Sequence, residues 1–133
     1  TFINDSKSTN IYSTISAIKS FTTNIILILG GYSKEKIEKK ILIDTINRSN
    51  IIKVFCYGSI GEKVLTIIKK IKPAWYCKMF KDAVLESINS ANKNDVVLLS
   101  PGFKSFDQFN NFEERGLEFK RIVNKYITLN ENK

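Results

Sequence analysis

Short, continuous apolar runs alternate along the chain with longer segments whose apolar residues recur at helical spacing. The clearest run covers residues 25–29, five consecutive aliphatic residues that end at Gly30. Such a run is typical of a parallel strand that is buried on both faces of a sheet. Similar runs predict strands over residues 51–57, 75–79 and 95–99, and residues 1–4 predict a short extended lead.

The intervening segments have the pattern of amphipathic helices. Residues 11–21 carry apolar side chains at Ile11, Ile15, Ile18 and Phe21, which lie on one helical face. We expect further helices over residues 34–47, with Ser33 as the capping residue, and over residues 59–70, 81–91 and 113–129. Strand and helix alternate about five times with short connections, which predicts a three-layer, Rossmann-like α/β domain. We expect residues 1–133 to form this single domain, with a mostly parallel sheet of five to six strands flanked by helices.

Composition and charge narrow the function classes. The formal net charge of +8 is compatible with a basic α/β module that binds nucleic acid or protein, although the lysines are scattered along the chain. Histidine is absent, which excludes Ser-His-Asp and Cys-His catalysis within this chain. Cys56 and Cys77 lie in apolar runs and are interpreted as reduced residues of a cytoplasmic protein. No apolar run approaches the ~20 residues that a membrane-spanning helix needs.

Polar segments follow the predicted strands, where ligands bind in parallel α/β sheets. They cover residues 4–10, 30–34, 57–61 and 100–112. The first segment combines Asp5, Lys7 and three hydroxyls at a helix start, which suits an anion, although a simple helix cap explains the same residues. The last segment contains four phenylalanines at i, i+3 spacing, which indicates a helical apolar stripe. Arg115 follows it closely and is expected to pair with a carboxylate.

Together these segments resemble the C-terminal domain of UDP-N-acetylmuramoyl-L-alanine:D-glutamate ligases, members of the muramyl ligase family. The matching stretches are NDSKSTN, GGYSK and LLSPGFKSFDQFNNFEERG. In the family the first typically has the form NDSKATN and the third the form LLSPACASFDxFxNFExRG. The resemblance covers nearly the whole chain in the same order.

The resemblance implies one domain of a three-domain, monomeric cytoplasmic enzyme of peptidoglycan synthesis. The N-terminal domain that binds the UDP end and the central domain that binds ATP and Mg²⁺ would lie outside this chain. ATP would activate the substrate carboxylate as an acyl phosphate, which the amine of D-glutamate would attack. The expected partners are D-glutamate, ATP, UDP-N-acetylmuramoyl-L-alanine and the two other domains, with no nucleic acid or membrane. We expect the isolated chain to bind no cofactor or metal and to be inactive.

The same resemblance assigns roles to eight residues of this chain. Lys7 would be the catalytic residue, where the incoming amino acid meets the nucleotide phosphates. ATP would be contacted by Asp5, Lys7 and Asn10. D-Glutamate would be bound by Thr9, Lys34, Ser105, Phe106 and Phe112, with Phe106 contributing a backbone contact.

The chain also departs from the family pattern. Ser33 stands where the family more often has Asp before the lysine, and Gly102, Phe103 and Lys104 replace the usual Ala-Cys-Ala. A muramyl ligase that adds L-lysine, diaminopimelate or a dipeptide would share the fold and remains an alternative. A lysine in the pocket favours an acidic amino acid over a basic one.

Overall fold

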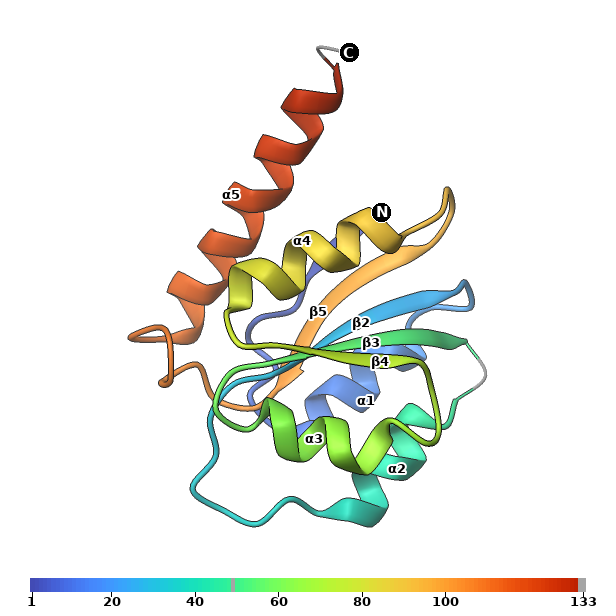
Figure 1. The fold of residues 1–133 in the computed structure, drawn as a ribbon, viewed down its shortest axis with the longest axis vertical. Coiled ribbons are helices and arrows are strands. Elements are labelled where there is room, and N and C mark those ends of the chain that lie inside the picture. The colour runs from blue at the N-terminus through green and yellow to red at the C-terminus, as the bar shows by residue number, and fades with distance from the viewer. Residues whose placement is uncertain (49, 132–133) are drawn as a thin grey trace.

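Five strands form one entirely parallel sheet in the order β1-β5-β2-β3-β4 (Figure 1). The computed structural model describes residues 1–48 and 50–131. The strands are β1 (Phe2–Asn4), β2 (Ile25–Gly30), β3 (Ile51–Tyr57), β4 (Ala74–Cys77) and β5 (Val96–Gly102). Because all strands run in the same direction, the loops that leave their carboxyl ends gather along one rim of the sheet.

The central strand β2 is buried on both faces. Ile25, Leu27 and Leu29 pack into one apolar cluster, whereas Ile26 and Ile28 pack into the other. This alternation follows from the strand period of two residues. Every residue of β2 is buried, which explains why its sequence is continuously aliphatic and not alternating.

Helices cover both faces and complete three layers (Figure 1). One face carries α1 (Ile11–Lys19), α2 (Lys39–Ile46) and α3 (Gly61–Ile68), and the other carries α4 (Phe80–Ser90) and α5 (Phe112–Glu131). The C-terminal part of α5 extends past the sheet, and Ile127 and Leu129 are exposed there. Within the described ranges, no helix is long and apolar enough to cross a membrane.

Side chains of the rim loops determine where three helices begin. The Asn10 Oδ1 accepts from the Ser13 N–H (3.0 Å) and caps α1. The Asn111 Oδ1 accepts from the Glu114 N–H (2.8 Å) and caps α5, while the Glu114 carboxylate accepts from the Asn110 N–H (3.1 Å). The cap of α4 comes from a distant residue, since the Gln108 Oε1 accepts from the Phe80 N–H (2.9 Å).

The predicted fold class is confirmed, with five strands that are all parallel. The helix predicted over residues 34–47 is wrong in its first part, because α2 begins only at Lys39. The Ser33 hydroxyl accepts from the Glu35 N–H (3.1 Å) and donates to the Glu35 carbonyl (3.2 Å), forming a local turn and no helix cap.

Candidate functional site

The polar segments at the carboxyl ends of the strands are joined to one another by hydrogen bonds to backbone carbonyls. The Tyr32 N–H donates to the Lys104 carbonyl (2.8 Å), and the Lys104 N–H donates back to Tyr32 (3.2 Å). The Gly102 N–H donates to the Ser8 carbonyl (2.9 Å), and the Ser59 hydroxyl donates to the Gly31 carbonyl (3.1 Å). Four loops that are far apart in sequence therefore form one continuous surface.

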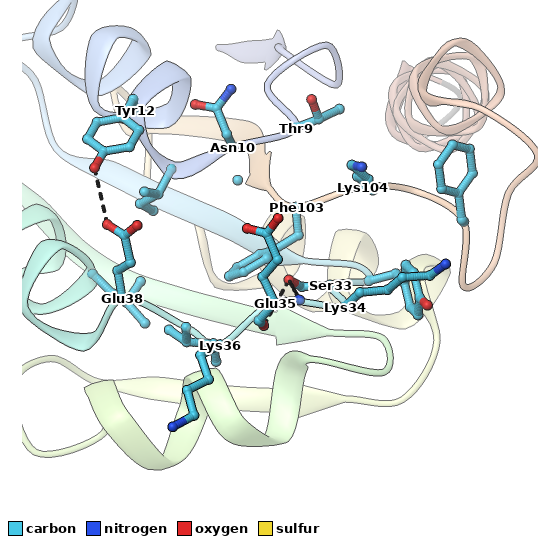
Figure 2. Close-up of a pocket in the computed structure, with 16 residues that line it drawn as sticks. Thr9, Asn10, Tyr12, Ser33, Lys34, Glu35, Lys36, Glu38, Phe103 and Lys104 are labelled. Atoms are coloured by element: carbon cyan, nitrogen blue, oxygen red, sulfur yellow. Dashed lines mark hydrogen bonds between the residues drawn. The ribbon is translucent and has the colours of Figure 1, made fainter.

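A pocket of about 440 Å³ opens on this rim (Figure 2). Figure 2 shows Thr9 and Asn10 on one side and the segment that contains Ser33, Lys34 and Glu35 on the other, with Phe103 and Lys104 between them. The full lining comprises Thr9, Asn10, Ile11, Tyr12, Tyr32, Ser33, Lys34, Glu35, Lys36, Ile37, Glu38, Leu42, Gly102, Phe103, Lys104 and Phe106.

The pocket lining carries charges of both signs, with a small cationic excess. The lining includes three lysines, Lys34, Lys36 and Lys104, and two glutamates, Glu35 and Glu38. The Tyr12 hydroxyl donates to Glu38 (3.1 Å), and this hydrogen bond raises the pKa of Tyr12. Cations beside neutral donors can bind a small molecule with carboxylate groups, and the glutamates can accept hydrogen bonds from an amine.

Four of the eight predicted site residues line this pocket, namely Thr9, Asn10, Lys34 and Phe106. The Phe106 side chain is 61% exposed, and Lys34 is also exposed. Ser105 lies between two lining residues but is itself only 3% exposed. Phe112 is the first residue of α5, is 39% exposed and is not among the residues that line the pocket. The structure therefore brings half of the predicted residues together in one pocket.

Asp5 and Lys7 lie in the loop that leads to Thr9. The Asp5 Oδ2 accepts from the Ser100 hydroxyl (2.7 Å) and from the Ser8 hydroxyl. These bonds join the first loop to the end of β5, so one carboxylate oxygen has a structural role. Lys7 is exposed between the buried residues Ser6 and Ser8, which places its side chain toward solvent at the rim.

The last rim loop, residues 103–111, contains no helix, so the predicted helical stripe of phenylalanines is wrong. Phe103 packs against the cluster under α1 to α3, whereas Phe109 packs on the opposite side, edge-on to Phe80 at 5.1 Å between ring centroids. Hydrogen bonds connect the loop to the segments that follow β3 and β4. The Ser59 N–H donates to the Asp107 Oδ2 (3.1 Å), and the Gln108 Nε2 donates to the Lys78 carbonyl (2.8 Å).

Arg115 does not pair with a carboxylate, which contradicts the sequence-based interpretation. Its side chain is 0% exposed, and its guanidinium donates to oxygens of Ser6, Tyr57 and Phe103 at 2.8–3.1 Å. Burial raises the pKa of the Tyr57 hydroxyl, although Arg115 beside it acts in the opposite direction. Tyr57 is therefore a neutral acceptor, and in the described part of the chain only Arg121 and Glu118 form an ion pair.

Sequence reasoning missed several residues of the pocket. Glu35, Phe103 and Lys104 line it, as do the hydrogen-bonded residues Tyr12 and Glu38. Glu35 and Lys104 could have been predicted from the sequence, because they are adjacent to the predicted site residues Lys34 and Ser105. The Tyr12–Glu38 pair joins residues 26 positions apart in two different elements, so no local pattern indicated it.

Comparisons with known proteins identify relatives of the whole chain. It is 43% identical over 129 residues to the UDP-N-acetylmuramoylalanine–D-glutamate ligase of Buchnera aphidicola. That alignment covers 96% of this chain and 28% of the relative. It is 38% identical over 130 residues to the enzyme of that name from Caldicellulosiruptor bescii, with 96% and 28% coverage. The chain is a homologue of the C-terminal domain of these ligases. It spans less than a third of the length of these relatives.

The resemblance to D-glutamate ligases stated from the three motifs is thus confirmed. No model of a known protein family matches the chain. Among solved structures, a domain ascribed to a UDP-N-acetylmuramate:L-alanyl-gamma-D-glutamyl-meso-diaminopimelate ligase of Haemophilus ducreyi has a TM-score of 0.53 at 18% identity. The alignment covers 97% of this chain and 86% of that domain, so the two share the same fold.

Proposed function

We propose that this chain is the amino-acid-binding domain of a ligase that joins D-glutamate to UDP-N-acetylmuramoyl-L-alanine in peptidoglycan synthesis. The observation that carries the proposal is the pocket in which Thr9, Lys34 and Phe106 lie together. These residues come from the three separate segments that resemble the ligase family. The names of the homologues, at 38–43% identity over nearly the whole chain, support the same substrate.

The pocket chemistry fits D-glutamate, which has two carboxylates and one amine. Lys34 supplies a cation for a carboxylate, and Thr9 supplies a neutral hydroxyl donor. Ser105, which lies between two lining residues, and Phe112, the first residue of α5, would complete the proposed D-glutamate site with the Phe106 backbone. Lys104 is a further cation on the lining that the family pattern does not contain.

The loop with Asp5 and Lys7 is proposed to face the ATP-binding side. The Asp5 Oδ2 is occupied by two serine hydroxyls, so its Oδ1 is the oxygen that would accept from a ribose hydroxyl. Asn10 would support it, and Lys7 would place a point charge near the phosphates. Residues 1–48 and 50–131 contain no cluster of three carboxylate, thiol or imidazole groups that could hold Mg²⁺.

The proposed role of this chain in the reaction is to orient and stabilise. D-Glutamate held by Lys34 and Thr9 would present its amine to the acyl phosphate formed from the alanine carboxylate. Attack would give a tetrahedral intermediate, which expels phosphate as the amide forms. Lys7 would stabilise the negative charge on the phosphoryl oxygens, so catalysis would come chiefly from positioning and electrostatics.

A substrate panel tests the proposal on the full-length protein that contains this chain. The protein is incubated with ATP, Mg²⁺ and UDP-N-acetylmuramoyl-L-alanine plus D-glutamate, L-glutamate, L-lysine or meso-diaminopimelate, and phosphate release and product mass are measured. We expect turnover with D-glutamate alone. Turnover with L-lysine or diaminopimelate would favour another amino-acid-adding ligase, and no turnover with any amino acid would reject the ligase function.

Two further assays address the isolated chain. It should release no phosphate with the same substrates, because the ATP- and UDP-binding domains are proposed to lie elsewhere in the protein. Robust turnover by the 133-residue chain would contradict the proposal that ATP and the UDP substrate are bound by other domains. A basic nucleic-acid-binding module would instead bind random-sequence DNA with a steep salt dependence, which the ligase proposal does not predict.

A further inference from the structure

Arg115 is a buried cation whose partners are all neutral oxygens. Its Nε donates to the Ser6 hydroxyl (2.9 Å) and its Nη2 to the Ser6 carbonyl (2.8 Å). Its Nη1 donates both to the Tyr57 hydroxyl (3.1 Å) and to the Phe103 carbonyl (3.0 Å). All three guanidinium nitrogens are thus used without a carboxylate. Burial of a charge is unfavourable unless its hydrogen bonds are made, so this arrangement needs each acceptor in place.

The acceptors belong to the loops that carry the proposed site. Ser6 directly precedes Lys7, and Phe103 lies one residue before Lys104 in the loop that carries Ser105. The Ser6 hydroxyl in turn donates to the Phe112 carbonyl (2.7 Å), which connects the first loop to the start of α5. The guanidinium therefore connects the first rim loop (residues 4–10), the end of β3 and the last rim loop (residues 103–111).

The second rim loop, residues 30–34, lies next to the Arg115 guanidinium. A Cβ atom added to Gly31 would lie 3.2 Å from the Arg115 Nη1 and 2.2 Å from the Lys104 carbonyl oxygen. A side chain therefore has no room between Gly31, the guanidinium and the loop that carries Lys104. All three segments that resemble the ligase family contact Arg115 or a residue bonded to it.

We infer that Arg115 is a positioning residue, which fixes the distance between the loop of Lys7 and Thr9 and the loop of Ser105 and Phe106. Arginine suits this task because its planar fork directs donors to several separate acceptors, whereas a lysine ammonium is a single point. The role rests on the proposed function, since it matters only if these loops hold D-glutamate and nucleotide. Arg115 itself is 0% exposed and is therefore not accessible to either ligand.

Kinetics of the full-length protein test this role. Arg115→Lys keeps the charge but lacks the fork, and it should raise the KM for D-glutamate at least tenfold. The KM for UDP-N-acetylmuramoyl-L-alanine should stay within twofold, because that substrate is proposed to bind elsewhere. Arg121→Lys is the matched control: the same substitution in the same helix, at an exposed residue paired with Glu118, should leave both values within twofold. An unchanged KM for D-glutamate, or equal changes for both substrates, would overturn the inference.

Hydrogen–deuterium exchange of the same proteins provides a readout that needs no activity. In Arg115→Lys, peptides covering residues 4–10 and 100–108 should exchange at least tenfold faster, since the Gly102 amide bonds to the Ser8 carbonyl and the Lys104 amide to the Tyr32 carbonyl. Peptides covering residues 51–57 and 94–99 should be unchanged. Equal exchange in all peptides of the variant and the unmodified protein would overturn the inference. If the unmodified protein ligates no D-glutamate, the proposed function fails, and exchange alone decides whether Arg115 positions the loops.

A milder variant covers the case in which Arg115→Lys does not fold. Ser6→Ala removes one acceptor of the guanidinium and the donor to Phe112 while leaving the charge and the other bonds. It should raise the KM for D-glutamate about threefold or more, with faster exchange confined to the rim loops. An unchanged KM and unchanged loop exchange in Ser6→Ala would count against the inference.

Discussion

The junction between the second and last rim loops depends on Gly31. Its φ is +125°, a conformation that L-residues other than glycine rarely adopt. A Cβ there would lie 2.2 Å from the Lys104 carbonyl oxygen, a distance that no real contact tolerates. The affected atom is backbone, which cannot rotate away as a flexible side chain could. Gly31→Ala should therefore force the two loops apart.

The expected loss of stability has two parts. An L-residue held at positive φ costs about 1–2 kcal/mol. Separation of the loops also breaks the hydrogen bond from the Tyr32 N–H to the Lys104 carbonyl, which contributes about 1 kcal/mol. Together they predict that the free energy of unfolding falls by about 2–3 kcal/mol. With a urea m-value of about 2 kcal/mol/M, the midpoint should fall by roughly 1–1.5 M.

Urea unfolding followed by circular dichroism measures this loss. The matched control is Lys36→Ala, an alanine substitution at an exposed residue of the same loop, which should change the free energy of unfolding by less than about 0.5 kcal/mol. The m-values of both variants should equal that of the unmodified chain. If Gly31→Ala is as stable as Lys36→Ala, the close contact between Gly31 and Lys104 does not exist in solution and the reasoning is refuted.

Two further predictions concern the core. Phe80 contacts the rings of Tyr57 and Phe109, each at 5.1 Å between centroids, so Phe80→Ala should lower the free energy of unfolding by about 3–5 kcal/mol in the same assay; a loss below 1 kcal/mol would contradict this packing. Burial raises the pKa of Cys56 from 9.0 to about 12. The unfolded chain then loses this proton at lower pH than the folded chain, so stability should fall between pH 9 and 12, by roughly 1.4 kcal/mol per pH unit at most. Cys56→Ala should flatten that slope, and an unaltered slope would assign the dependence to other groups.

The fold was predictable because its signals are local and periodic. The aliphatic run of β2 can be satisfied only by burial on both faces, and short connections between strand and helix leave a parallel sheet as the solution. The error at α2 has a local cause that competes with the helix. Ser33 bonds to Glu35 in a turn, and Tyr32 pairs with Lys104 from a distant loop. Helical propensity alone does not report either contact.

The site was predictable only in part, for a related reason. Thr9, Lys34 and Phe106 were identified through motifs, and the parallel sheet explains why their loops meet at one rim. The role of Arg115 was not predictable, because its acceptors are backbone carbonyls and hydroxyls up to 109 residues away. A charged residue in sequence suggests a charged partner, and only the folded structure shows that neutral oxygens satisfy it.

The proposed recognition of D-glutamate by the rim pocket is tested most directly by comparing two lysines of one loop. Lys34 and Lys36 carry the same charge two residues apart, and Figure 2 shows the Lys36 side chain directed away from Thr9 and Lys104. In the full-length protein, Lys34→Ala should raise the KM for D-glutamate at least tenfold, whereas Lys36→Ala should change it by less than threefold. Equal KM values for the two variants would contradict the assignment of this pocket to the amino acid.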